Sequence, residues 1–119
     1  MKRHSFAFDF DGVIASYNGF KGANHTQPPI PAVVDAIRTL KERGHTIIIH
    51  STRGEKLLRQ YLEQHNIPFD YINENPARAG ENPGKPVAYA YIDDRAVCYK
   101  GQSADELVHE LTTFKAYWQ

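Results

Sequence analysis

Short apolar runs alternate along this chain with longer segments whose apolar residues recur at helical spacing. The runs have the length of buried strands: one begins at Phe6, and others cover 45–50, 69–72 and 87–92. A last short strand is predicted at 96–99. Runs that are apolar at consecutive positions are typical of parallel strands covered on both faces.

Helices are predicted between these runs. Pro31 opens a helix that ends at Gly44, and a second helix covers about 55–65. A capping box of Ser103 and Glu106 opens the last helix, which has an apolar stripe of Leu107, Leu111 and Phe114. The aromatic residues that follow, Tyr117 and Trp118, are expected to pack this helix on the sheet or to contact another subunit. The order of elements predicts a doubly wound α/β fold with a mainly parallel sheet flanked by helices.

Two stretches lack a regular period. Residues 15–30 form an unusually long loop, and loops of this length inside a compact domain are often functional. Because Tyr17 and Phe20 are apolar for a solvated linker, we interpret it as a flap over a site; a surface loop is the alternative. The stretch 73–84 is rich in Asn, Pro and Gly and predicts a further loop.

Composition narrows the class of protein. The 119 residues suffice for one core, so we expect a single domain, 1–119. Lys plus Arg equals Asp plus Glu at 14 each, which weighs against a nucleic-acid partner. No apolar run has the length of a membrane span and the first residues lack a signal-peptide pattern, so we expect a cytoplasmic protein. The single cysteine, Cys98, excludes an internal disulfide and is expected to be a buried thiol.

Polar side chains follow three of the predicted strands. They are Asp9 and Asp11, then Ser51, Thr52 and Arg53, and finally Asp93 and Asp94. The carboxyl ends of parallel strands are where ligands bind in open α/β sheets, and hard carboxylate oxygens suit Mg²⁺. Each group also has a structural alternative: a solvated Asx turn for the aspartates, a helix cap for Ser51, and an ion pair with the acidic cluster for Arg53.

With these motifs the chain resembles the haloacid dehalogenase superfamily of phosphotransferases over most of its length. The segment Asp9-Phe-Asp-Gly-Val matches the first motif of the family, Ser51 the second, Lys85 the third and Asp93-Asp94 the fourth, in the family's order. The resemblance implies a Rossmann-like core.

The resemblance also implies a role for each matching residue. Asp9 is the expected nucleophile, which forms an aspartyl-phosphate, and Asp11 the expected general acid and base. Mg²⁺ is expected at Asp9, at the backbone carbonyl of Asp11 and at the acidic pair, directly on Asp94 with Asp93 farther out. Lys85 is expected to stabilise the transferring phosphoryl group, which Ser51, Thr52 and Arg53 are expected to bind. Without the resemblance, Lys85 would be expected to be solvated, as lysines in loops rich in Gly and Pro usually are.

The cap domain that members of this family usually carry has no room here. The two positions at which it is inserted hold only 15–30 and 73–84, so the chain resembles a capless member. Such members act on large substrates or have their open site covered by a neighbouring subunit, which leaves a homo-oligomer open.

The expected function is therefore a Mg²⁺-dependent phosphatase. Its expected substrate is a phosphorylated sugar or saccharide precursor. The runner-up is a 3′-phosphatase acting on nucleic-acid ends, because Ser51-Thr-Arg and Asp93-Asp-Arg are similar to motifs of polynucleotide kinases. A receiver-type signalling domain and a binding protein with an inactive site remain as alternatives from other classes.

Overall fold

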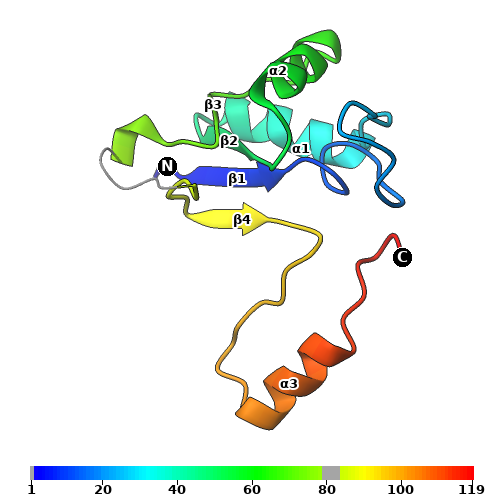
Figure 1. Cartoon of the computed structure of the whole chain (residues 1–119). Helices are drawn as coiled ribbons and strands as arrows, with labels where there is room; N and C mark the ends of the chain where they lie inside the picture. Colours follow the sequence, from blue (N-terminus) through cyan, green and yellow to red (C-terminus); the bar gives the residue numbers. More distant parts are fainter. Residues whose placement is uncertain (1, 79–83) are drawn as a thin grey trace.

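The structure, a computed structural model, describes residues 2–78 and 84–119. Its elements are β1 (Ser5–Asp9), α1 (Pro31–Glu42), β2 (Thr46–His50), α2 (Glu55–Gln64), β3 (Tyr71–Ile72), the 3₁₀ helix η1 (Pro76–Arg78), β4 (Ala90–Ile92) and α3 (Ala104–Thr112). The four strands pair in parallel in the order β3-β2-β1-β4 (Figure 1). This confirms the predicted α/β fold with a parallel sheet flanked by helices.

The strand order places a reversal of direction beside β1. The chain proceeds from β1 to β2 and β3 on one side, and then returns to place β4 on the other side of β1. Such a switch point leaves a crevice at the carboxyl ends of the two strands, and ligands of doubly wound sheets bind there. The carboxyl ends of β1 and β4 are therefore the part of this fold best placed for a site.

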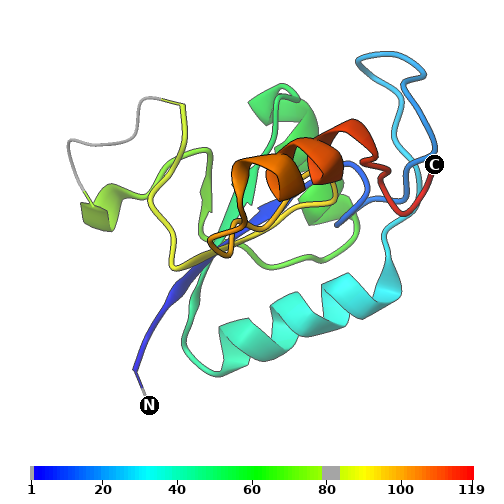
Figure 2. The same ribbon diagram turned by 90° about the horizontal axis from the view of Figure 1, so that it is seen from below.

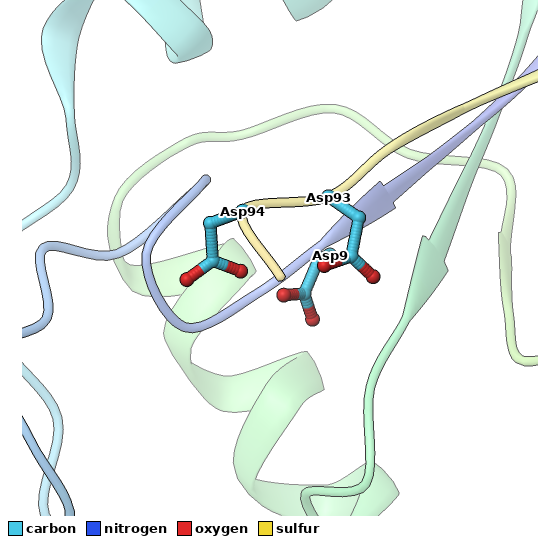
Figure 3. A group of neighbouring side chains, drawn as sticks. All are labelled: Asp9, Asp93 and Asp94. Atoms are coloured by element: carbon cyan, nitrogen blue, oxygen red, sulfur yellow. The ribbon is translucent and has the colours of Figure 1, made fainter. Parts of the chain in front are cut away.

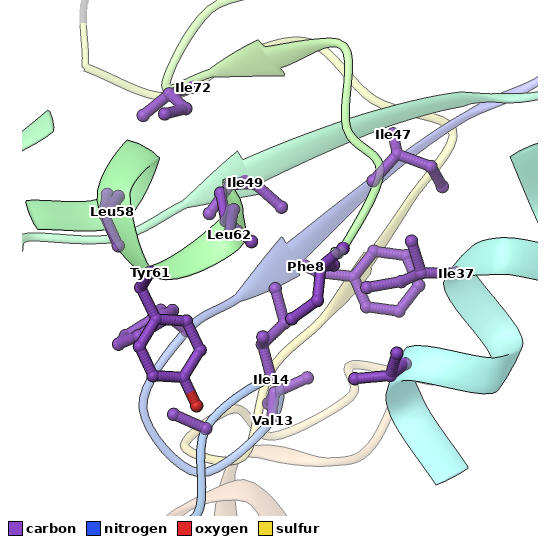
Figure 4. Packing of buried hydrophobic residues seen from close by; sticks show 14 residues of the cluster. Phe8, Val13, Ile14, Ile37, Ile47, Ile49, Leu58, Tyr61, Leu62 and Ile72 are labelled. Carbon is purple, nitrogen blue, oxygen red and sulfur yellow. The ribbon is translucent and has the colours of Figure 1, made fainter. Parts of the chain in front are cut away.

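One face of the sheet forms the main core. Phe8 of β1 and Ile47 and Ile49 of β2 point to this face, because side chains two positions apart on a strand share a side. They pack against buried residues of α1 and α2, as Figure 4 shows for Ile37, Leu58, Tyr61 and Leu62. On the opposite face Ala7 and Ile48 are also buried, which explains why β1 and β2 are apolar at consecutive positions.

The part of the chain after β4 differs from its prediction. Residues 96–99 form no strand, and Cys98, expected to be buried there, is exposed. The predicted capping box of Ser103 and Glu106 is confirmed, but α3 has no buried residue, and Leu111 of its apolar stripe is 56% exposed. The helix lies away from the sheet, and the segment after it returns to the loop 15–30 (Figure 2).

No helix of the described chain is both long and apolar enough to cross a membrane.

Candidate functional site at the carboxyl ends of β1 and β4

Three carboxylates meet at the switch point. Asp9 is the last residue of β1, and Asp93 and Asp94 follow β4 directly. Each offers a ligand oxygen that lies within 4.8 Å of those of the other two, although the two strands are separated by about 80 residues of sequence. Figure 3 shows the three side chains directed towards one another. The pairing of β1 with β4 in parallel register therefore creates an acidic cluster.

Mutual repulsion and burial alter the protonation of Asp9. Burial in the crevice, the close approach of the Asp94 carboxyl and the charge of Asp93 raise the pKa of Asp9 from 3.8 to about 8, against an opposing hydrogen bond from the backbone N–H of Phe10. Without a cation the cluster thus favours a shared proton over three negative charges. A divalent cation relieves the same repulsion.

The two adjacent aspartates have different surroundings. Asp93 is exposed, and its Oδ1 accepts a hydrogen bond from the backbone N–H of Arg95 at 2.7 Å, which forms an Asx turn. Asp94 Oδ2 accepts a hydrogen bond from the indole N–H of Trp118, whereas Asp94 Oδ1 is buried without a hydrogen-bond partner among the described residues. A buried unpartnered carboxylate oxygen beside two further hard oxygens fits a Mg²⁺ site.

Asp11 is held by Arg53. The guanidinium Nε and Nη2 donate to the two carboxylate oxygens of Asp11, both at 2.9 Å, and Nη1 donates to the backbone carbonyls of Gly22 and Ala23. The hydrogen bond with Asp11 raises the pKa of Arg53 further. This geometry agrees with the structural alternative for Arg53, an ion pair with the acidic residues, and ties the loop 15–30 to the end of β2.

Ser51 lies in a turn that Asn73 fixes. The side chain of Asn73 accepts from the backbone N–H of Ser51 and donates to its carbonyl, both at 2.9 Å. Ser51 Oγ accepts a hydrogen bond from the backbone N–H of Arg53 at 3.1 Å, which leaves its hydroxyl proton free to donate. The N-cap of α2 is Gly54, so Ser51 does not cap this helix.

A cavity of about 610 Å³ joins these groups. Its lining comes from the ends of β1, β2 and β4 and from the loop 15–30, and it includes Asp9, Asp11, Tyr17, Phe20, Ser51, Thr52, Arg53, Asp93 and Asp94. The loop is anchored at its base by hydrogen bonds between Ser16 and Pro28 and between Ile14 and Ile30, and farther along by the Tyr61 hydroxyl, which donates to the Gln27 carbonyl at 2.6 Å. Tyr17 and Phe20 therefore lie at the site as the flap interpretation expects.

Lys85 lies beside this cavity. Its side chain is exposed, with Nζ 4.7 Å from the centroid of the Tyr91 ring. Together with Asp9 and His50 it lines a neighbouring cavity of about 590 Å³. Asp9 is thus shared between the cavity that holds Ser51 and the one that holds Lys85.

Three residues at the site were not predicted to belong there: His50, Asn73 and Trp118. His50 is the register partner of Asp9 on β2, and its Nδ1 is buried without a hydrogen-bond partner in the described chain. Gly12, at φ +84°, lies against Asp94 and Trp118, and Asn73 fixes the turn of Ser51. The place of His50 just before Ser51 was a usable signal, whereas the contact of Trp118 has no local sequence signal.

The comparisons with known proteins agree with this geometry. The chain belongs to the haloacid dehalogenase-like hydrolases, because the model of that family matches residues 6–116. The family indicates a hydrolase in general terms. Among solved structures the chain is similar to a conserved protein of Bacteroides thetaiotaomicron, with 23% identity, a TM-score of 0.65, and coverage of 93% of this chain and 90% of the other. At that identity the likeness shows the fold alone. A comparison with curated proteins found no match.

Proposed function

We propose that this chain is a Mg²⁺-dependent phosphomonoester hydrolase that acts through an aspartyl-phosphate on Asp9. The observation that carries the proposal is the convergence of Asp9, Asp93 and Asp94, whose ligand oxygens lie within 4.8 Å of one another in a cavity shared with Ser51. Membership of a hydrolase family whose motifs match these positions supports it. We further propose that residues 1–119 act as a single catalytic domain.

Asp9 and Asp11 are assigned the two chemical roles. A carboxylate oxygen of Asp9 attacks phosphorus, the bond from phosphorus to the leaving oxygen breaks, and Asp11 gives that oxygen a proton. Water then attacks the same phosphorus and loses a proton to Asp11, while the bond between phosphorus and Asp9 breaks. Since Arg53 occupies both oxygens of Asp11, Arg53 has to release one of them during the cycle.

Mg²⁺ fits the acidic cluster, with Asp9, Asp94 and the backbone carbonyl of Asp11 as its ligands and Asp93 as an outer support. A bound cation at this place supplies the positive charge that lets a carboxylate approach a phosphate. Asp94 Oδ1 is the oxygen that the fold leaves without another partner in the described residues.

The phosphate is assigned to the turn after β2. The Ser51 hydroxyl has its proton available, and Thr52 and the backbone amides of the same turn precede the N-terminus of α2, where a helix favours anions. Lys85 is assigned to the transferring phosphoryl group across Asp9, which requires its ammonium to leave the Tyr91 ring. Arg53 binds the substrate when it releases Asp11.

For the substrate we propose a phosphorylated sugar or saccharide precursor. Most residues that line the cavity are polar or charged, and Tyr17 and Phe20 of the loop 15–30 add aromatic rings to the lining, against which a sugar can pack. The net charge of zero is a poor match for a nucleic-acid end. The nucleophile on the first strand also differs from a receiver domain, which carries its phosphorylated aspartate on a middle strand.

The test is phosphate release from a panel that contains sugar phosphates, other small phosphomonoesters and 3′-phosphorylated oligonucleotides, with Mg²⁺ and with chelator. We expect Mg²⁺-dependent release confined to the sugar phosphates. Release from the oligonucleotides alone would replace the substrate class. Calorimetric binding of Mg²⁺ without release from any member of the panel would contradict the hydrolase.

A further inference from the structure

The segment after α3 reaches the acidic cluster from a part of the chain that the family's motifs do not include. Trp118 donates its indole N–H to Asp94 Oδ2, and its ring meets Tyr17 edge to face with centroids 4.8 Å apart. The neighbouring Tyr117 hydroxyl donates to the Gly12 carbonyl at 2.6 Å. The segment therefore touches the turn after β1, the aspartate after β4 and the loop 15–30 at once.

The turn after β1 is shaped for this contact. A Cβ at Gly12 would lie 2.2 Å from Asp94 Oδ2 and 3.0 Å from Trp118 Nε1, so only glycine leaves room for the pair. Ala116 is 3% exposed, and its N–H donates to the Gln119 side chain at 2.8 Å, which fixes the backbone that carries Trp118. Trp118 is consequently held by its contacts with Asp94 and Tyr17 and by the fixed backbone that carries it.

The hydrogen bond from Trp118 makes the two carboxylate oxygens of Asp94 different. Trp118 engages Oδ2, whereas Oδ1 is buried and has no partner among the described residues. A carboxylate with one oxygen bound to a fixed N–H has its orientation set before a cation arrives, and such supporting hydrogen bonds tune metal affinity in proteins.

We propose that Trp118 is a positioning residue: its indole N–H orients Asp94 so that Oδ1 faces a divalent cation, and its ring links this aspartate to the loop 15–30 through Tyr17. The proposal rests on the proposed function for the cation. It adds a residue that touches neither the substrate nor the cation and acts through Asp94.

The first experiment compares Mg²⁺ binding by calorimetry in the wild type, in W118F and in Y99F. W118F keeps an aromatic ring but lacks the N–H, and we expect about tenfold weaker Mg²⁺ binding. Y99F removes the hydroxyl of an exposed tyrosine outside the segment after α3, and we expect unchanged binding. In turnover, W118F should raise the Mg²⁺ concentration for half-maximal rate while kcat at saturating Mg²⁺ is retained. A merely structural role would lower the active fraction at every Mg²⁺ concentration instead.

The second experiment keeps the proposal testable if W118F does not fold. Trp118 is the single tryptophan of the chain, so its emission reports directly on this contact. Mg²⁺ added to the wild type should change the emission with a midpoint equal to the calorimetric dissociation constant, and D94N should abolish that change. Equal Mg²⁺ affinity of W118F and wild type, or calorimetric binding with no change in emission, would overturn the proposal. Absence of any Mg²⁺ binding in the wild type would instead be a failure of the proposed function.

Discussion

Residues 5–72 and residues 84–119 deliver carboxylates to the same site through different kinds of contact. The first part contains every member of the main core cluster, from Phe8 to Ile72. The second part contributes few buried side chains, and its helix α3 contributes none. The radius of gyration of 15.3 Å exceeds the roughly 13.5 Å expected for a compact chain of this length, in agreement with a helix that stands away from the sheet.

The difference between the two parts shows that Asp9 and Asp94 are positioned in different ways. Asp9 stands at the end of a strand surrounded by core residues, so its place follows from burial of the first part. Asp94 stands in the second part, and the Trp118 side chain rather than packing orients it. Changes to core residues of the first part should therefore act on the fold, and changes to the contact of Trp118 with Asp94 should act on cation binding.

The largest effect is expected for the nucleophile. D9N removes the attacking carboxylate at nearly constant volume, so we expect turnover to fall by about 10³-fold or more while the chain remains folded. Phosphate release and thermal unfolding measure the two quantities. D35N, an equivalent change of an exposed aspartate on α1, serves as the control and should keep full turnover. Comparable turnover of D9N and D35N would remove Asp9 from the mechanism.

A pair of leucine truncations tests whether the core lies in residues 5–72 and leaves α3 outside it. Leu62 on α2 is fully buried, and Leu62→Ala should lower the free energy of unfolding by about 2–5 kcal/mol. Leu111 on α3 is 56% exposed, and Leu111→Ala should change it by less than about 0.5 kcal/mol. Denaturant unfolding of both variants measures the contrast. A large loss for Leu111→Ala would show that another surface covers α3 in solution.

Substitution of Arg53, which binds both oxygens of Asp11, is expected to have an intermediate effect on catalysis. Arg53→Lys cannot reproduce two parallel hydrogen bonds to one carboxylate together with the contacts to the loop 15–30, so we expect kcat/KM to fall by roughly 10-fold to 100-fold. Steady-state kinetics on the substrate found in the panel measures it. The exposed pair of Arg59 with Glu55 offers the control Arg59→Lys, which should leave kcat/KM unchanged. Equal kinetics of the two variants would assign Arg53 no part in the site.

Two glycines with nearly equal backbone angles allow the effect of backbone strain to be distinguished from the effect of a steric clash. Gly12 has φ +84° and Gly101 has φ +87°, but only a Cβ at Gly12 would meet other atoms within 4 Å. Both alanine variants should lose about 1 kcal/mol of stability from backbone strain. Gly12→Ala should in addition weaken Mg²⁺ binding, because its Cβ displaces Asp94. Calorimetry of both variants checks this, and equal Mg²⁺ affinity would contradict the close approach.

The stability of the metal-free protein is also expected to depend on pH. Asp9 has a pKa of about 8 in the folded chain against 3.8 for a free carboxyl, so folding takes up a proton between these limits. The contribution to stability is complete below the lower pKa and is lost as pH rises through the upper one. In chelator, the melting temperature of the wild type should therefore fall more steeply than that of D9N between about pH 4 and pH 8. Parallel curves would refute the raised pKa.

The regular spacing of apolar residues predicted those helices and strands whose apolar faces lie in the core. The helices that begin at Pro31 and Glu55 and the strands of residues 5–9 and 46–50 appear close to their predicted limits, because their periodicity is itself the pattern of the core. The prediction was wrong for 96–99 and for the buried state of Cys98. An apolar run forms a strand only if it pairs with a neighbouring strand, and residues 96–99 pair with none of the strands in the described sheet.

The sequence by itself determined the α/β fold, the family and which carboxylates are candidates for chemistry, because strand ends and motif order are local properties of the chain. Only the tertiary structure decided that Arg53 grips Asp11, that Asn73 fixes the turn of Ser51, and that Trp118 orients Asp94. Each of these contacts joins residues at least 22 positions apart. Their partners are chosen by the pairing of strands and the return of the chain after α3, which no local pattern records.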